Sequence, residues 1–228
     1  MPQSSDPIRV ELHCHSRYSK DSVQSLDAII RACKRRRVDV LALTDHNEIE
    51  GAVKMKAVAP DWLTVIVGEE VATADGDLTG LFLTEKIPAR LSMAETIERI
   101  HAQGGLAVAP HPFDRLRHEA MGGEQLARVK DAVDFVEVFN SRNVFDADNH
   151  SSQLFVNRHN LAGVVASDAH WPREVGTSVC VIEPFDGTSA DFAAKLRNAK
   201  LEPHRSNMLV HVGTAVVKRA KKLRRMVK

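Results

Sequence analysis

Short apolar runs alternate along the chain with longer segments in which apolar residues recur every three or four positions. The short runs predict buried strands, and the longer segments predict helices that cover a sheet with one face. This alternation predicts an α/β fold in which helical crossovers join parallel strands. The expected strands span residues 10–12, 38–43, 64–67, 77–84, 106–109, 132–139, 163–167 and 177–182.

Helices are expected between these strands. Segment 25–37 has apolar residues at helical spacing, and Ser92 with Glu95 forms a capping box that Gly104 closes at the other end. Further helices are expected over 48–59 and 151–160, and again from residue 189 toward a basic tail. About eight strands favour a closed or nearly closed barrel, in which catalytic groups collect at the C-terminal ends of the strands.

Imidazoles and carboxylates recur where the expected strands end. His13 and His15 follow the first strand, and they point to the same side because side chains alternate along a strand. Two imidazoles on one face can bind one metal ion. A barrel would bring all such strand ends to one rim, so the pattern predicts a metal site there. The pattern repeats at Asp45-His46, Glu69-Glu70, His111 and Asp168-Ala169-His170.

Several of these residues also have an ordinary structural explanation. Asp21 fits a turn, and Asp45 fits either a helix cap or a partner that orients a metal ligand. Adjacent strand residues face opposite sides, so only one of Glu69 and Glu70 is expected at the metal, with the other solvated or paired. By the same alternation, Cys14 is expected to point away from the two histidines as a thiol of the core.

Composition narrows the class of protein. We expect one domain over residues 1–228, with a basic helical tail from about residue 205. A net charge of +1 gives no global sign of nucleic-acid or membrane binding. Three cysteines suit a reducing compartment, and no signal core or membrane span is apparent, so a cytoplasmic protein is expected. The eleven histidines, against one tyrosine and two tryptophans, strengthen the metal hypothesis.

The strand-end motifs resemble those of the PHP (polymerase and histidinol phosphatase) family, in its stand-alone bacterial and archaeal form. The resemblance implies a distorted seven-stranded (β/α) TIM-like barrel with the metal site at the C-terminal strand ends, so one counted strand would be an extra hairpin arm. It also implies phosphoester hydrolysis with two or three divalent ions. The matching strings, in family order, are Glu-Leu-His13-Cys-His15-Ser-Arg-Tyr-Ser-Lys-Asp21, Ala-Leu-Thr-Asp45-His46, Val-Gly-Glu-Glu70, His111-Pro-Phe and Ala-Ser-Asp168-Ala-His170.

The resemblance assigns metal ligands by position. Asp77 is a further candidate ligand, a carboxylate at a position where many family members have histidine. In a second departure from the family pattern, Asp21-Ser22 replaces the usual Asp-Gly. The mixed imidazole and carboxylate set suits Zn, Mn or Fe. By resemblance, one ion is held by His13, His15, Glu70 and Asp168, a second by Glu70 and His111, and a third by Asp21, His46 and His170.

The expected reaction is attack of a metal-bound hydroxide on a phosphate ester. Arg17 and Arg142 are candidates to bind the substrate phosphate, although Arg17 equally fits a surface residue, and Arg205 is a weaker candidate. Scarce aromatic residues and the near-neutral charge favour a small phosphorylated metabolite or nucleotide, while the basic tail leaves a short oligonucleotide open. No stable protein partner is indicated. The catalytic set, acting through the metal, comprises His13, His15, Glu70, His111 and Asp168.

Two alternatives stay open. An amidohydrolase-like C–N hydrolase also has His-x-His at a barrel strand, but it predicts a lysine at a strand end, and the sequence has none there. A non-catalytic metal-binding module is the second, and the intact ligand set argues against it. The histidines away from strand ends, such as His101 and His204, and the basic run 34–37 are interpreted as surface groups.

Overall fold

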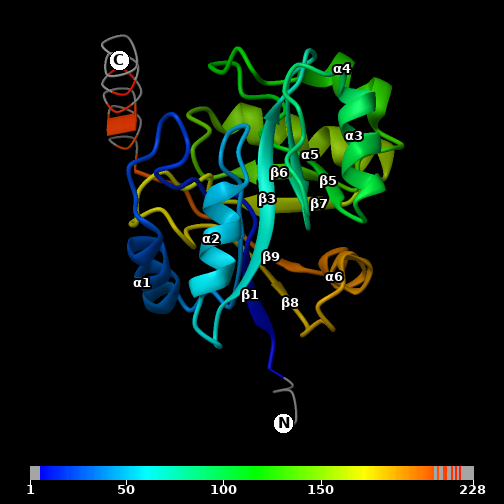
Figure 1. Cartoon of the computed structure of the whole chain (residues 1–228). Coiled ribbons are helices and arrows are strands. Elements are labelled where there is room, and N and C mark those ends of the chain that lie inside the picture. Colours follow the sequence, from blue (N-terminus) through cyan, green and yellow to red (C-terminus); the bar gives the residue numbers. More distant parts are fainter. Residues whose placement is uncertain are drawn as a thin grey trace.

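The computed structural model describes residues 6–207 and, beyond them, residues 210, 213, 214, 217, 219 and 221. Within this part of the chain, one mixed sheet of nine strands has the order β7-β6-β5-β4-β3-β2-β1-β8-β9 (Figure 1). Its strands are β1 (Ile8–Glu11), β2 (Val40–Leu43), β3 (Thr64–Ala72), β4 (Asp77–Leu81), β5 (Leu106–Ala109), β6 (Phe135–Asn140), β7 (Gly163–Ala166), β8 (Val179–Ile182) and β9 (Lys200–Glu202).

The first seven strands of the sheet meet at one rim. Past the end of β1, the His15 N–H donates to the Ala169 carbonyl at 2.9 Å, and the Ala169 N–H donates to the His13 carbonyl at 3.1 Å. Residue 169 follows β7, so this parallel bridge joins the two ends of the circuit from β1 to β7. Below the rim, β8 occupies the seam, where the Cys180 thiol contacts the backbone of Val165. The expected distorted seven-stranded barrel is therefore confirmed.

The expectation of parallel strands is wrong for two of the expected strands, and the unexpected β9 is antiparallel as well. β4 is antiparallel to both β3 and β5, because it returns from β3 through a tight hairpin. β8 pairs antiparallel with β1, and β9 pairs antiparallel with β8. The hairpin also extends β3 to Ala72, beyond the expected end at residue 67. Glu69 and Glu70 consequently lie inside β3. They come after Val67, the last residue of β3 that pairs with β2.

Six helices of the described residues surround the sheet. Figure 1 shows α1 and α2 on one side and α3, α4 and α5 on the other, with α6 near β8 and β9. The Ser25 and Ser92 hydroxyls cap α1 and α3 by accepting from the Ala28 and Glu95 N–H groups, as helix-start residues do. The helices are α1 (Leu26–Arg36), α2 (Glu50–Val58), α3 (Met93–Ala102), α4 (Gly122–Val129), α5 (Asp146–His159) and α6 (Ser189–Leu196).

The C-terminal part of the chain departs from the expected pattern. The helix predicted over 151–160 begins earlier, at Asp146, and the segment from residue 189 contains β9 after α6. Most of the basic tail predicted from about residue 205 lies outside the described residues. Of its described part, the Lys221 ammonium donates to the carbonyls of Ser19 and Ser22 at 2.6 Å each. Lys221 thereby contacts the loop that carries Asp21.

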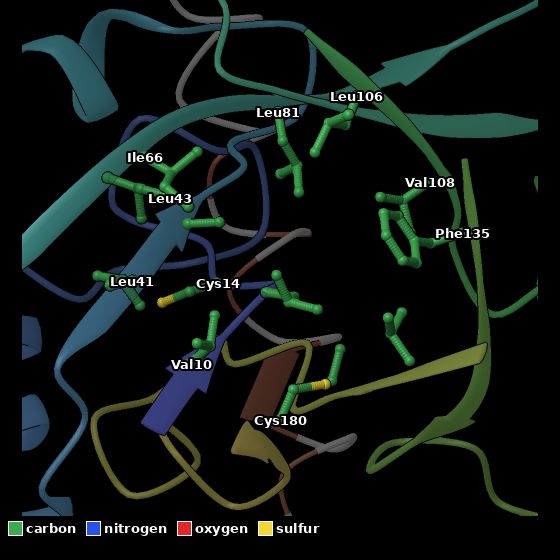
Figure 2. Close-up of a cluster of buried hydrophobic side chains, with 14 of the residues drawn as sticks. Val10, Cys14, Leu41, Leu43, Ile66, Leu81, Leu106, Val108, Phe135 and Cys180 are labelled. Carbon is green, nitrogen blue, oxygen red and sulfur yellow. The ribbon is translucent and has the colours of Figure 1, made fainter. Parts of the chain in front are cut away.

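An apolar core lies within the fold, formed mainly by strand residues and the inner faces of the helices. Figure 2 shows part of it, including Val10, Leu41, Ile66 and Phe135. Cys14 belongs to this cluster and is fully buried, as the alternation of side chains along the chain predicted. None of the described helices is both long enough and apolar enough to cross a bilayer.

Candidate metal centre

One carboxylate, that of Glu70 on β3, contacts four imidazoles at the rim. Its Oε2 lies 3.3 Å from His13 Nε2 and 3.2 Å from His15 Nε2. The same oxygen is 3.1 Å from His46 Nδ1, and Oε1 is 3.0 Å from His111 Nε2. The four histidines come from three separate segments, so the barrel has brought together groups that the sequence spreads over about a hundred residues.

The remaining predicted ligands surround these imidazoles. Asp168 Oδ1 is 3.3 Å from His15 Nε2, and Asp21 is 3.2 Å from His46 and 3.4 Å from His170. Together they make three overlapping groups whose ligand atoms lie within 4.8 Å of one another. These groups contain eight of the nine predicted metal ligands: His15, Asp21, His46 and His170 in one, His13, His15 and Asp168 in another, and His13, Glu70 and His111 in the third.

The donor atoms fit divalent cations. His13 and His15 face each other through Nε2 atoms only 3.0 Å apart, while their Nδ1 atoms contact Glu137 at 2.8 Å and Ser19 at 3.0 Å. Those partners can accept a hydrogen bond from Nδ1, and with the proton there each neutral ring would offer its Nε2 lone pair to a cation. Metal–nitrogen bonds of about 2.0–2.1 Å place two neighbouring ligand nitrogens about 3 Å apart, so a shared ion accounts for this approach. Asp168 Oδ1 and His111 Nδ1 are also buried without a hydrogen-bond partner.

Charges within the cluster oppose one another. Burial resists ionisation of Glu70, but the neighbouring His46 and His13 hold its pKa well below the ordinary range. Burial lowers the pKa of His15, yet contact with Asp168 and Glu70 outweighs it and raises the pKa to about 9. His170 shifts the other way, to a pKa of about 4, because of burial and the nearby His15. The pKa of His13 is also raised well above its ordinary range, by Asp168, Glu70 and Glu137, so protonation of His13 and His15 offsets carboxylate charge in the ion-free cluster.

Asp77 is the predicted ligand that belongs to none of the three groups. It is buried at the start of β4, and burial together with the charge of Glu70 raises its pKa to about 8. Its carboxyl group is thus close enough to Glu70 to sense its charge. The assignment of Asp77 as a metal ligand stays a prediction.

Two positions in the cluster have unusual backbone geometry. His111 has a φ of 28° and Asp168 a φ of 53°, although neither is glycine. Such conformations cost on the order of 1–3 kcal/mol each and persist where the surroundings hold them. At His111 the backbone N–H donates to Glu137 Oε2 at 2.9 Å, which anchors the strained residue. Strain of this kind is concentrated at functional sites.

Glu137 and Glu11 are buried carboxylates to which sequence reasoning gave no role. Glu137 accepts from His13 Nδ1, from the His111 N–H and from Asn140 Nδ2, so one side chain orients two candidate ligands. Glu11 accepts from the N–H groups of His13, Ser167 and Gly176 at 3.0–3.1 Å, and burial raises its pKa to about 7. Glu137 is a charged residue near the end of the strand predicted over 132–139, which was the available signal. Glu11 lies within a strand and gave none.

Arg117 was also missed. Its Nη2 donates to Asp168 Oδ2, and its Nε donates to Asp114 Oδ2 at 3.0 Å. The side chain is 22% exposed, so it reaches from the buried carboxylate toward solvent. Arg117 lies in the loop after His111. This loop has no periodic pattern that would distinguish one of its polar residues as functional.

The two arginines predicted to bind phosphate lie elsewhere. Arg17 is exposed, with its guanidinium 5.9 Å from the ring centre of Tyr18. Arg142 is buried and donates to Glu174 Oε2 at 3.1 Å and to Thr214 Oγ1 at 2.9 Å. Among the described residues, neither guanidinium makes a hydrogen bond or ion pair with a member of the three groups. Their role as phosphate ligands stays a prediction.

Asp45 and Glu69 complete the set of residues considered from sequence. Asp45 accepts from the Ser16 N–H and hydroxyl, both at 2.6 Å, and so fixes the loop that follows His15. It does not cap α2, whose N-cap residue makes no side-chain hydrogen bond. Glu69 is buried on the opposite face from Glu70 and accepts from the Ile87 N–H at 2.8 Å, so it is paired rather than solvated.

Comparison with known proteins identifies the family. The family profile described as "PHP domain" matches residues 11–165, and one described as "PHP-associated" matches residues 146–201. The first match covers most of the chain. The chain therefore belongs to the PHP domain family, as its motifs suggested.

Relatives and solved structures agree with this assignment. Uncharacterized protein MJ0417 of Methanocaldococcus jannaschii is 32% identical over 213 residues, covering 89% of this chain and 85% of the relative. The structure of PsfC from Pseudomonas syringae has a TM-score of 0.71 at 17% identity, covering 94% of this chain and 99% of PsfC. A two-domain protein from Bacteroides vulgatus, described as containing a predicted PHP-like metal-dependent phosphoesterase, has a TM-score of 0.63 at 18% identity. That match covers 87% of this chain and 65% of the neighbour. The two structural likenesses show a shared fold.

Proposed function

We propose that this protein is a metal-dependent phosphoesterase that hydrolyses a phosphate ester of a small metabolite or nucleotide. The observation that carries the proposal is the contact of one buried carboxylate, Glu70, with four imidazoles within 3.3 Å. Such an arrangement suits a carboxylate that bridges two cations. Membership of the PHP family and the description of the Bacteroides vulgatus neighbour support the same reaction class.

In this proposal the residues form two sets of metal ligands and one supporting residue that orients a ligand. His13, His15, Asp168 and His111 would hold ions that Glu70 bridges, and Asp21, His46 and His170 would complete a third site. When bound, Zn, Mn or Fe ions supply Lewis acidity toward phosphoryl oxygens and acidify water. Glu137 keeps the His13 proton on Nδ1 and so holds Nε2 available as a ligand.

Arg117 is proposed to bind the substrate phosphate. Its guanidinium already lies against Asp168 at the cluster, and part of the side chain faces solvent. A planar guanidinium has five N–H donors, so groups remain for a phosphate oxygen after the bonds to Asp114 and Asp168. Substrate entering from solvent would therefore meet a cation directly beside the proposed ions.

The test combines metal depletion with a phosphatase assay. Protein stripped with a chelator and reloaded with Mn, Zn or Fe(II) is assayed on a chromogenic phosphomonoester, sugar phosphates and nucleotides, alongside metal analysis. We expect turnover to disappear on stripping and to return on reloading. The His15→Ala variant should stay inactive after reloading, while His101→Ala, which alters an exposed histidine paired with Asp134, should behave like the wild type.

Two results would contradict the proposal. Turnover that is unaffected by complete metal removal would exclude the proposed mechanism. A folded protein that binds two or three ions and hydrolyses no phosphoester in the panel would instead indicate a metal-binding module without this activity.

A further inference from the structure

A large open groove lies outside the three ligand groups, none of whose members lines it. It has a volume of about 1270 Å³ and lies between the C-terminal end of α1, the segment 171–177 and the segment 204–207 after β9. In Figure 1, α1 and the yellow segment after β7 lie on the same side of the sheet. We call it the arginine groove, because its lining includes Arg9, Arg35, Arg36, Arg37, Arg173 and Arg205 and no lysine among the described residues.

Four of these six arginines are not neutralised by an acidic partner. Arg9 pairs with Glu202 and Arg205 pairs with Asp146. Among the described residues no ion pair involves the other four, and two of them, Arg35 and Arg36, make only long 3.4 Å contacts to backbone carbonyls of segment 171–177. A chain whose net charge is +1 thus gathers uncompensated positive charge in one groove.

The single carboxylate that lines the groove connects it to the metal centre. Glu174 Oε2 accepts from the His170 N–H and from the Trp171 N–H, both at 3.1 Å. His170 belongs to a candidate metal group, while Trp171 lines the groove. The charge of Glu174 is matched by Arg142 behind it, so it does not offset the groove arginines. Glu174 is therefore the point at which the lining of the groove contacts the backbone of a candidate metal ligand.

We propose that the arginine groove binds the phosphate backbone of a single-stranded oligonucleotide. The groove is larger than the about 300–1,000 Å³ that suits a small ligand. Arginine forks onto phosphate oxygens and stacks on bases, which distinguishes it from lysine in nucleic-acid sites. The Trp171 indole adds a surface for a base. Binding in the groove does not depend on the proposed phosphoesterase function.

Binding is tested without the reaction. A fluorescein-labelled ten-nucleotide single strand is titrated with the whole chain in chelator, and anisotropy is followed from low to moderate salt. With about four phosphates neutralised, the slope of log K against log salt should be about −3, since each phosphate contributes about −0.7 on a single strand. The double variant Arg36→Gln/Arg173→Gln should bind at least about tenfold more weakly, with a slope smaller in magnitude by about 1.4.

A matched control removes the same charge elsewhere. Arg99→Gln/Arg128→Gln alters two exposed helix arginines that pair with Glu95 and Glu124 outside the groove, so its affinity should stay within about twofold of the wild type. No binding by the wild type, or equal weakening in both double variants, would overturn the proposal. Equally tight binding of base-free inorganic polyphosphate would overturn the oligonucleotide assignment.

The two proposals fail separately. Arg36→Gln/Arg173→Gln should retain wild-type turnover of the small chromogenic phosphomonoester, because neither arginine contacts the metal groups. A protein that binds the strand but hydrolyses no ester would refute the proposed function and leave the groove assignment standing. A protein that hydrolyses the small ester but does not bind the strand would refute the groove assignment alone.

Discussion

The cluster around Glu70 and the apolar core are equally hidden from water, yet they act on the protein in opposite ways. Glu70 and Leu41 both have no exposed surface. Burying Leu41 stabilises the fold by removing apolar surface from water. Burying Glu70 costs desolvation energy, and the ionised carboxylate is stable there only because the facing histidines offset that cost. The comparison indicates that the core supplies stability and that the cluster is retained for what it binds.

The largest expected effect separates these two roles at the cluster itself. Glu70→Gln keeps the shape of the side chain but removes the charge proposed to bridge two ions, so kcat/KM should fall at least about 1,000-fold, or about 4 kcal/mol. The ion-free variant should unfold at a lower temperature than the ion-free wild type, because the buried imidazoles lose their counter-charge. Phosphomonoester turnover, metal content and calorimetry measure the three effects.

Glu69→Gln is the matched control for this substitution. Glu69 is also buried on β3 but lies on the opposite face and bonds only to the backbone of Ile87. We expect its metal content and turnover per folded molecule to match the wild type. A comparable loss of activity in both variants would show that the loss comes from disturbing strand β3, and not from removing a bridging carboxylate.

The next largest effect is expected for a substitution in the apolar core. Leu41→Ala should lower the free energy of unfolding by about 2–5 kcal/mol, because it removes buried methyl groups and leaves a cavity. Turnover of the metal-loaded, folded variant should be unchanged. Denaturant unfolding measures the first and the phosphatase assay the second, with the exposed Leu154→Ala expected within about 0.5 kcal/mol of wild type. A core variant with normal stability would contradict the division of roles.

A smaller effect is expected where the two regions meet. Glu137→Gln removes the charge that holds His13 Nδ1 and the His111 backbone, while leaving every proposed ligand in place. Metal affinity should weaken about 10–100-fold, the range typical for a partner that orients a ligand. Saturating metal should restore much of the turnover, which a general loss of folding would not allow. Isothermal titration with Mn or Zn gives the affinity.

The smallest effect concerns the thiols of the core. Burial raises the pKa of both Cys33 and Cys180 from about 9 to about 12, so at pH 9 the native thiols should resist iodoacetamide while the denatured chain reacts. Because the folded pKa exceeds the unfolded value, their contribution to stability is complete below pH 9 and is lost as pH rises toward 12. Mass spectrometry of native and denatured samples measures the labelling. Fast native labelling at pH 9 would show that the core opens to solvent.

The sequence by itself determined most of the cluster and the outline of the fold. Eight of the nine predicted ligands converge, because parallel strands of a barrel must end at one rim and side chains alternate along each strand. His13, Glu70 and Asp168 could be recognised because each lies where an apolar run gives way to polar residues. These patterns depend only on neighbouring residues, so the sequence shows them before the tertiary contacts are known.

Only the tertiary structure decided which residues support and surround that cluster. Glu137 meets His13 across more than a hundred residues, Arg117 reaches Asp168 from a loop without periodicity, and the antiparallel β4 depends on pairing with strands on both sides. The groove arginines look like an ordinary basic helix end until segment 171–177 is placed against them. Contacts between distant segments leave no periodic trace in the chain, because they are fixed by packing and charge after the backbone has closed on itself.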